Sequence, residues 1–278
     1  MKRLFAIIML ALTVLSVGGL AAYSVHKSMA SGGLPPEIHF DKERIEVETT
    51  ATDAELLKGV TATDQEDGDV TASLVVERIS HLVEDSTVNV TYVAFDSQNH
   101  VTRASREVCY TNYTSPRFTL TKPLLFTTQT VSDLMKCIGA KDCIDGDLSL
   151  KVHASFDDAV SVLSEPGVHD VELTVTNSLG DTVRVTVPVR VADDMPHSEN
   201  IPLKTYLVYV EQGSSFDPKA YLSNLDTAAA DDEADGVHIS SNVNTGTPGS
   251  YAVDYTLTKN DAVTASTRLI VVVEGKGA

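Results

Sequence analysis

The sequence predicts an all-β chain of three tandem β-sandwich modules that follow an N-terminal hydrophobic helix. Three observations support this prediction: a charge-free apolar segment near the start, an internal repeat with a period of about eighty residues, and an apolar spacing of two within each copy. The length of 278 residues agrees with several domains, because one hydrophobic core seldom grows beyond about 250 residues.

The apolar segment Leu4–Tyr23 contains no charged residue and follows the basic pair Lys2–Arg3. About twenty helical residues at 1.5 Å each cross a hydrocarbon layer of roughly 30 Å, whereas a cleaved secretory signal has a shorter apolar region. We therefore expect residues 1–30 to be a signal-anchor of a single-pass cell membrane protein, with the N-terminus cytoplasmic and the C-terminal part extracellular. Small residues at 19–21 and 28–30 also suit a signal peptidase, so secretion after cleavage is the alternative.

The internal repeat appears as two ungapped matches that share one offset of 78 residues. Residues 56–60 recur as 134–138, and the acidic residues 64–69 recur as 142–147. Chance similarity seldom keeps register over this many positions. The first two copies therefore predict the same module, and a divergent third copy keeps the pair Asp235–Gly236.

Each copy also contains a strand-like segment at the same place, in residues 88–92, 169–173 and 251–255. The apolar side chains of residues 183–191 recur at every second position, which is typical of a strand with one buried face. Turn-forming residues lie between the strand pairs, at 96–99, 177–180 and 259–261. Short strands with frequent turns predict antiparallel sandwiches. We expect three separable modules, at residues 31–112, 113–193 and 194–278.

These residues resemble a known family, the bacterial surface Ig-like modules that also occur in pesticidal crystal toxins and in tandem on Gram-positive surface proteins. The resemblance rests on the Asp-x-x-Asp-Gly-Asp segment, on Gly213–Pro218 and on the hairpin Tyr92–Asn99. It covers the first module well and the second moderately, while the third has Val237 in place of the final Asp. The resemblance implies immunoglobulin-like sandwiches used as extracellular spacers or binding units, with no shared catalytic residue.

The acidic segments are the candidate site. Several carboxylates within one turn could supply the six to eight oxygen ligands that Ca²⁺ prefers. The alternative is a tight turn with solvated acids, which the Asp-Gly pairs and the lack of a distal bidentate Glu favour. No other cofactor is expected. The candidate Ca²⁺ ligands are Asp64, Glu66, Asp67, Asp69, Asp142, Asp145 and Asp147.

The cysteines form the second candidate feature. Cys137 and Cys143 lie six positions apart in a module that we expect to face an oxidising exterior, so a small disulfide loop is predicted there. Cys109 is left over. Two thiols without a matched Cys or His pair make only half of a zinc site.

Composition and motifs limit the function. A net charge of −18 opposes binding to nucleic acid, which needs clustered Lys and Arg. The sequence has no nucleophile elbow, zinc-protease motif or phosphate-binding loop, so an enzyme is not expected. We predict a non-catalytic cell-surface protein that serves as a structural spacer or adhesion scaffold, with an unknown surface protein or glycan as its partner. The alternatives are a Ca²⁺- or ligand-binding module and an accessory subunit of a surface enzyme complex.

Overall fold

The computed structural model divides the chain into two compact units, Met1–Asn112 and Tyr113–Ala278. The structure describes residues 33–156, 165–194, 201–223, 236–259 and 262–275. The expected anchor at residues 4–23 lies outside these ranges. Within them, no helix combines the length and apolar character that a membrane span requires.

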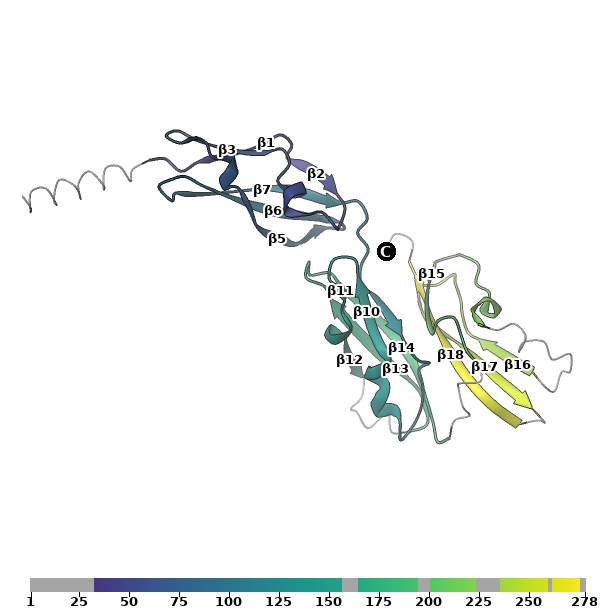
Figure 1. Ribbon diagram of the computed structural model, residues 1–278. Coiled ribbons are helices and arrows are strands. Elements are labelled where there is room, and N and C mark those ends of the chain that lie inside the picture. The colour runs from purple at the N-terminus through teal and green to yellow at the C-terminus, as the bar shows by residue number, and fades with distance from the viewer. Residues whose placement is uncertain (1–32, 157–164, 195–200, 224–235, 260–261, 276–278) are drawn as a thin grey trace, which may run out of the picture. The chain divides into compact units, whose positions relative to one another are not determined.

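The first unit is a sandwich of two sheets (Figure 1). The smaller sheet has the order β1 (Glu37–Phe40), β3 (Val60–Asp64), β4 (Gly68–Asp69). The larger sheet has the order β2 (Arg44–Val47), β7 (Val101–Tyr110), β6 (Thr87–Phe95), β5 (Val75–Glu84). Its edge strand β2 runs parallel to β7, and the other pairs are antiparallel.

The core of the first unit lies between these sheets. Every second residue of β6 points inward, and Val88, Val90 and Tyr92 are fully buried. The Tyr92 ring packs against Phe40 of the opposite sheet, with ring centroids 5.5 Å apart. The Tyr92 hydroxyl donates a hydrogen bond of 2.8 Å to the carbonyl of Leu56, so the end of a short helix is bound to the core.

The second unit begins with a sandwich of the same design. One sheet has the order β11 (Gly146–Asp147), β10 (Ile138–Asp142), β8 (Arg117–Leu120). The other has the order β12 (His153–Phe156), β13 (Gly167–Thr176), β14 (Thr182–Ala192), β9 (Leu125–Thr127). Strand β9 again lies parallel to its neighbour β14.

The second unit ends with a third copy of the four-stranded sheet. Its order is β15 (Leu207–Glu211), β18 (Ala262–Glu274), β17 (Gly249–Lys259), β16 (Gly236–Ser241). One face of this sheet packs against Ile201, Leu203 and Leu222. The edge strand β15 runs parallel to β18, as in the other two copies.

Short helices connect these strands. They are α2 (Asp53–Leu56), η1 (Thr71–Ser73), η2 (Val131–Asp133), α3 (Leu134–Cys137), η3 (Ser149–Lys151) and η6 (Pro218–Tyr221). Helices α2 and α3 follow the predicted repeat, and their buried residues Leu56 and Leu134 stand at the same offset as the sequence match.

The structure confirms the predicted all-β class with repeated sheets. The expected strand segments 88–92, 169–173 and 251–255 lie in β6, β13 and β17, which occupy the same place in each four-stranded sheet. The first unit ends at Asn112, beside the expected module boundary. The further boundary expected at residue 193 stays a prediction.

Candidate functional site

The acidic turn of the first copy folds around the carboxylate of Asp64. Its Oδ1 accepts the backbone N–H groups of Glu66 at 2.8 Å and Asp67 at 2.9 Å. This bonding lets an aspartate begin a tight turn. Gly68 completes the turn with φ of +74°, a region that glycine enters without the steric cost of a Cβ atom.

The same turn is bound to a distant loop by Asp67. Its carboxylate accepts the Ser97 backbone N–H at 2.7 Å and the Ser97 hydroxyl at 2.9 Å. Beside it, the Gln98 amide donates to Glu66 at 2.6 Å. Residues 97 and 98 lie in the loop between β6 and β7, so two loops separated by about thirty positions are held together. We call these two hydrogen bonds, which the serine backbone N–H and hydroxyl donate to one aspartate carboxylate, the loop clamp.

A buried aspartate shapes the partner loop from inside. Asp96 Oδ1 accepts the N–H groups of Gln98 at 2.9 Å and His100 at 2.8 Å, and Asp96 Oδ2 lies 2.7 Å from His100 Nδ1. Burial opposes ionisation of Asp96, but the hydrogen bonds from His100 and Gln98 outweigh burial and lower the pKa of this carboxyl. The ionised carboxylate of Asp96 therefore stabilises the conformation of the loop that contains Ser97.

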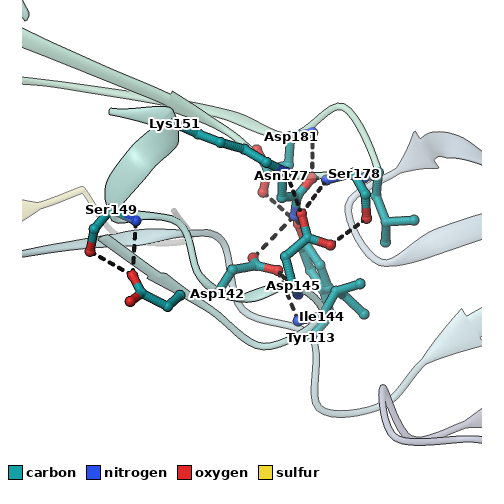
Figure 2. A network of polar contacts seen from close by, with 11 residues as sticks. Tyr113, Asp142, Ile144, Asp145, Ser149, Lys151, Asn177, Ser178 and Asp181 are labelled. Carbon is teal, nitrogen blue, oxygen red and sulfur yellow. Dashed lines mark hydrogen bonds and ion pairs between the residues drawn. The ribbon is translucent and has the colours of Figure 1, made fainter. Parts of the chain in front are cut away.

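The second copy repeats the aspartate turn and the loop clamp (Figure 2). Asp142 Oδ1 accepts the N–H groups of Ile144 and Asp145, both at 2.8 Å. Asp145 accepts the Ser178 N–H at 2.8 Å and the Ser178 hydroxyl at 2.6 Å. Gly146 has φ of +73°, close to the +74° of Gly68. The loop clamp is thus common to the first two copies.

The last aspartate of each acidic segment has a separate partner. Asp69 accepts the N–H of Thr71 at 2.9 Å, and Asp147 accepts the N–H of Ser149 at 2.9 Å. Thr71 and Ser149 are the first residues of the short helices η1 and η3. Hydrogen bonds from the side chains of Thr71 and Ser149 lower the pKa of the Asp69 and Asp147 carboxyls, and hydrogen bonds from their backbone N–H groups contribute less to the same shift.

The second copy adds a tyrosine to the network. Asn177 stands where the first copy has Asp96, and its Nδ2 donates to the Tyr113 hydroxyl at 2.9 Å and to Asp142 Oδ2 at 3.1 Å. The Tyr113 hydroxyl donates in turn to Asp181 at 2.7 Å. Burial, together with the neighbouring Asp181 carboxylate, raises the pKa of Tyr113 well above its ordinary value. Sequence reasoning missed Tyr113, which is the first residue of the expected second module.

Asp145 keeps its charge despite partial burial. Its side chain is 16% exposed, and Lys151 Nζ lies 3.2 Å from its Oδ2. Burial opposes ionisation, but the Ser178 bonds and then Lys151 outweigh it and lower the pKa of Asp145. An ionised acceptor forms stronger hydrogen bonds than a neutral one. The charge therefore strengthens the clamp.

The predicted Ca²⁺ ligands lie in these two turns and point to different partners. Asp64 and Asp142 accept N–H groups of their own turns, while Asp67 and Asp145 accept bonds from Ser97 and Ser178. In the part of the chain that the structure describes, no group of three acidic, histidine or cysteine side chains is placed to hold a metal ion. Ca²⁺ binding by these segments stays a hypothesis.

The structure does not bring the predicted disulfide pair together. All three cysteines are free, and Cys137 and Cys143 flank the five residues of β10 at opposite ends. At about 3.3 Å per strand residue the two Cα atoms are roughly 20 Å apart, whereas a disulfide needs less than about 7 Å. Cys143 instead contacts the backbone of Thr114, with Sγ 3.1 Å from its carbonyl oxygen and 3.4 Å from its nitrogen.

The first unit also has a surface groove of about 710 Å³ beside β2 and α2. Its lining mixes acids and bases, such as Asp41, Arg44, Glu48 and Lys58, and includes no histidine, cysteine or aromatic ring. No aromatic ring in this lining offers a surface on which a sugar could stack.

A buried arginine is the other feature that sequence reasoning missed. The Arg106 side chain is fully buried, and its guanidinium donates to the carbonyls of Leu56 at 2.5 Å and Lys58 at 2.9 Å. It also donates to the Tyr92 hydroxyl at 3.0 Å, and Asp41 lies 3.6 Å away. Arg106 thus binds the end of α2 to the core.

The fold and these turns define a chain of repeated immunoglobulin-like modules whose acidic segments bind their own loops. Residues 205–272 match a family described as bacterial surface protein, Ig-like domain. The third copy is therefore a bacterial surface Ig-like domain, a kind of domain that is exposed outside the cell and is in general not catalytic. The sequence resemblance is confirmed, although the match falls on the copy in which it was weakest. The comparison with curated proteins finds no match.

Similar solved structures resemble the chain weakly. One is the structure of CBM51-2 in complex with GlcNAc and INT domains from Clostridium perfringens ZmpB, which is 16% identical to this chain at a TM-score of 0.22. The match covers 56% of this chain and 26% of the other. The protocadherin gamma B4 extracellular domain is 12% identical at 0.20, covering 88% and 50%. A lipoprotein from Bacteroides thetaiotaomicron is 12% identical at 0.20, covering 84% and 98%. The chain thus spans a quarter to a half of the first two, and these scores give no ground for transferring a ligand.

Proposed function

We propose that the chain is a non-catalytic cell-surface protein that serves as a structural spacer or adhesion scaffold. The observation that carries this proposal is the repeated loop clamp. In each copy one acidic residue, Asp67 or Asp145, accepts hydrogen bonds from the serine of the facing loop. Another, Asp64 or Asp142, accepts N–H groups of its own turn. Carboxylates used in this way stabilise a scaffold, and recognition then falls to the exposed loops and strands.

The proposal places the sheets outside the cell, with the segment Leu4–Tyr23 as a single membrane anchor. The family match at residues 205–272 supports a surface location. The net charge of −18 favours a soluble, self-repelling exterior. A surface protein or a glycan is the proposed partner. Exposed loop residues that differ between the copies, such as Asn99 and Gly180, give each module its own surface.

The location is tested on bacteria that express the full chain. Intact cells are treated with a protease that cannot enter them, and the membrane-bound protein is then measured by mass spectrometry. We expect cleavage of residues beyond 31 on intact cells and an undigested N-terminal segment in the membrane fraction. A chain that is cleaved only after cell lysis would contradict the surface location. A soluble product that begins near Ala22 or Ser31 would replace the anchor with secretion.

The adhesive role is tested by comparing cells that carry the chain with cells from which its gene is deleted. We expect the deletion to reduce attachment to a glycan-coated or protein-coated surface, and the full chain to restore it. Restoration by a variant with Asp67→Asn and Asp145→Asn would support a structural role for the acidic turns. Equal attachment with and without the chain would leave the spacer role and contradict adhesion.

A further inference from the structure

The third sheet is buried on both faces, although a sheet of a sandwich usually buries only one. On its inner face, Val253, Tyr255 and Leu269 are fully buried in a core of its own. On the opposite face, Leu207, Ile270 and Val272 are at most 7% exposed. These three side chains belong to the hydrophobic core of the second copy, together with residues such as Phe118 and Val189. One apolar core therefore continues across the two copies within the second unit.

The first copy shows that this outer face need not be apolar. Tyr92 and Tyr255 are equivalent, because each is the fully buried tyrosine of the inner strand and donates its hydroxyl to a carbonyl of a short helix. Tyr92 pairs with Ala104 and Tyr255 pairs with Thr267, so Glu107 and Ile270 stand at the same place three residues later.

The parallel edge strands extend this comparison. Arg44 pairs with Glu107 in the first copy, as Leu207 pairs with Ile270 in the third. The side chains of Arg44 and Glu107 are 51% and 53% exposed, whereas Leu207 and Ile270 are buried. The same positions are thus charged and open to solvent in one copy and apolar and covered in another. Leu207 and Ile270 are therefore apolar because the second copy covers them, and not because the fold requires apolar residues there.

A paired charge borders this apolar contact. Arg268 of β18 is almost fully buried and binds Asp254 of β17 through Nε at 2.7 Å and Nη2 at 2.8 Å. Its Nη1 donates to the carbonyl of Pro188 in the second copy at 3.2 Å, and Arg190 lies 3.5 Å from the same Asp254 carboxylate. A buried guanidinium is costly unless its donors are satisfied, and here one acceptor comes from the other copy.

The other edge of the contact contains a tyrosine and an ion pair. The Tyr209 hydroxyl accepts the backbone N–H of Phe118, which is itself buried, at 2.8 Å. The Arg117 guanidinium lies over the Tyr209 ring at 4.8 Å and binds Glu274 at 2.8 Å. The contact therefore combines an apolar centre with polar bonds on two sides.

From these contacts we infer that residues 113–278 fold and unfold as one cooperative unit with a fixed joint between the second and third copies. A detached third copy would expose Leu207, Ile270 and Val272 together and would leave Arg268 Nη1 without its acceptor. The third copy is then not an autonomous domain, in contrast to the sequence-based expectation of three separable modules. This inference does not depend on what the protein binds, so failure of the proposed function leaves it intact.

The test is hydrogen–deuterium exchange of the full chain in moderate denaturant, read separately for β13 and β17. Ile270→Ala removes apolar contact from the shared core. We expect protection of both strands to fall by roughly 30-fold or more, which corresponds to about 2 kcal/mol. Tyr209→Phe is a milder variant that keeps the ring and removes only the acceptor of the Phe118 N–H. It should lower protection of both strands by about fivefold to tenfold.

The matched control is Val90→Ala, which removes buried apolar contact from the first unit. It should lower protection of β6 and leave β13 and β17 unchanged. If Ile270→Ala prevents folding, β13 and β17 should lose protection together, which also supports the inference. In either variant, loss of protection in β17 with β13 exchanging as in the native chain would overturn it.

Discussion

The loop clamp predicts the effect of Asp145→Ala on the stability of the second unit. The substitution removes the acceptor of the Ser178 N–H and of the Ser178 hydroxyl, at 2.8 and 2.6 Å, and also a contact to Lys151 at 3.2 Å. The backbone turn itself should persist, because Asp142 still accepts the N–H of residue 145. The expected result is a loop that detaches from an otherwise intact sandwich.

The magnitude follows from the exposure of the partners. A hydrogen bond to a charged group contributes about 1.5–3 kcal/mol when it is well formed. Ser178 is exposed, so water can replace part of what Asp145 supplies. Lys151 is 56% exposed, and such surface ion pairs contribute at most about 1 kcal/mol. We therefore expect Asp145→Ala to lower the free energy of unfolding by about 1–3 kcal/mol, and Lys151→Ala by less than about 1 kcal/mol.

Urea denaturation of the full chain, with Ca²⁺ and with a chelator, measures this difference. The clamp predicts the same loss in both solutions, and Asp67→Ala should reproduce it in the first unit. The Ca²⁺ hypothesis predicts a native chain that Ca²⁺ stabilises, because a ligand bound only by the folded state must raise its stability. Stabilisation by Ca²⁺ that disappears in Asp145→Ala, or a cost below about 0.5 kcal/mol in both solutions, would refute our reasoning.

Three further predictions concern single positions. Gly68→Val should cost about 1–3 kcal/mol in thermal denaturation through backbone strain alone, because φ is +74° and no atom lies within 4 Å of the new Cβ. Burial raises the pKa of Tyr209 to about 12, above the value of about 10 in an unfolded chain, so its contribution is complete below about pH 10 and is lost as the pH rises towards 12. Alkaline unfolding should therefore be shallower in Tyr209→Phe, and equal slopes would contradict this. Arg106→Ala should lower the free energy of unfolding, measured in urea, by more than about 2 kcal/mol. Asp41→Asn should lower it by less than about 1 kcal/mol, because the Asp41 side chain is 57% exposed. Similar losses in the two variants would contradict these roles.

The repeat could be predicted from the sequence because each half of the loop clamp leaves a local signal. The Asp-Gly pairs mark the turns, and an Asp or Asn followed by Ser marks the loops at 96–97 and 177–178. Both kinds of signal were recognised as turns. Their bond to each other was not, because the partners Asp67 and Ser97 lie 30 positions apart and neither has a periodicity that points to the other.

The failures of prediction have a different cause. Cys137 and Cys143 are close in sequence, but the residues between them form an extended strand that separates the two thiols. Arg106 lies in an alternating strand at a position that faces inward, where the pattern alone predicts an apolar side chain. Its burial depends on the carbonyls of Leu56 and Lys58, about fifty positions earlier in the chain. Such contacts become visible only when the sheets are assembled.

The third copy shows how a repeat can lose one source of stability and gain another. Lys259 stands where the first copy has the buried Asp96 and the second copy has Asn177. This replacement removes the side-chain acceptor that orders the corresponding loops of the other two copies. In exchange, Leu207 and Ile270 pack into the core of the second copy. Hydrophobic burial of this kind needs no exact bond geometry, so a copy that has a neighbour to pack against can vary its turns more freely than the first copy can.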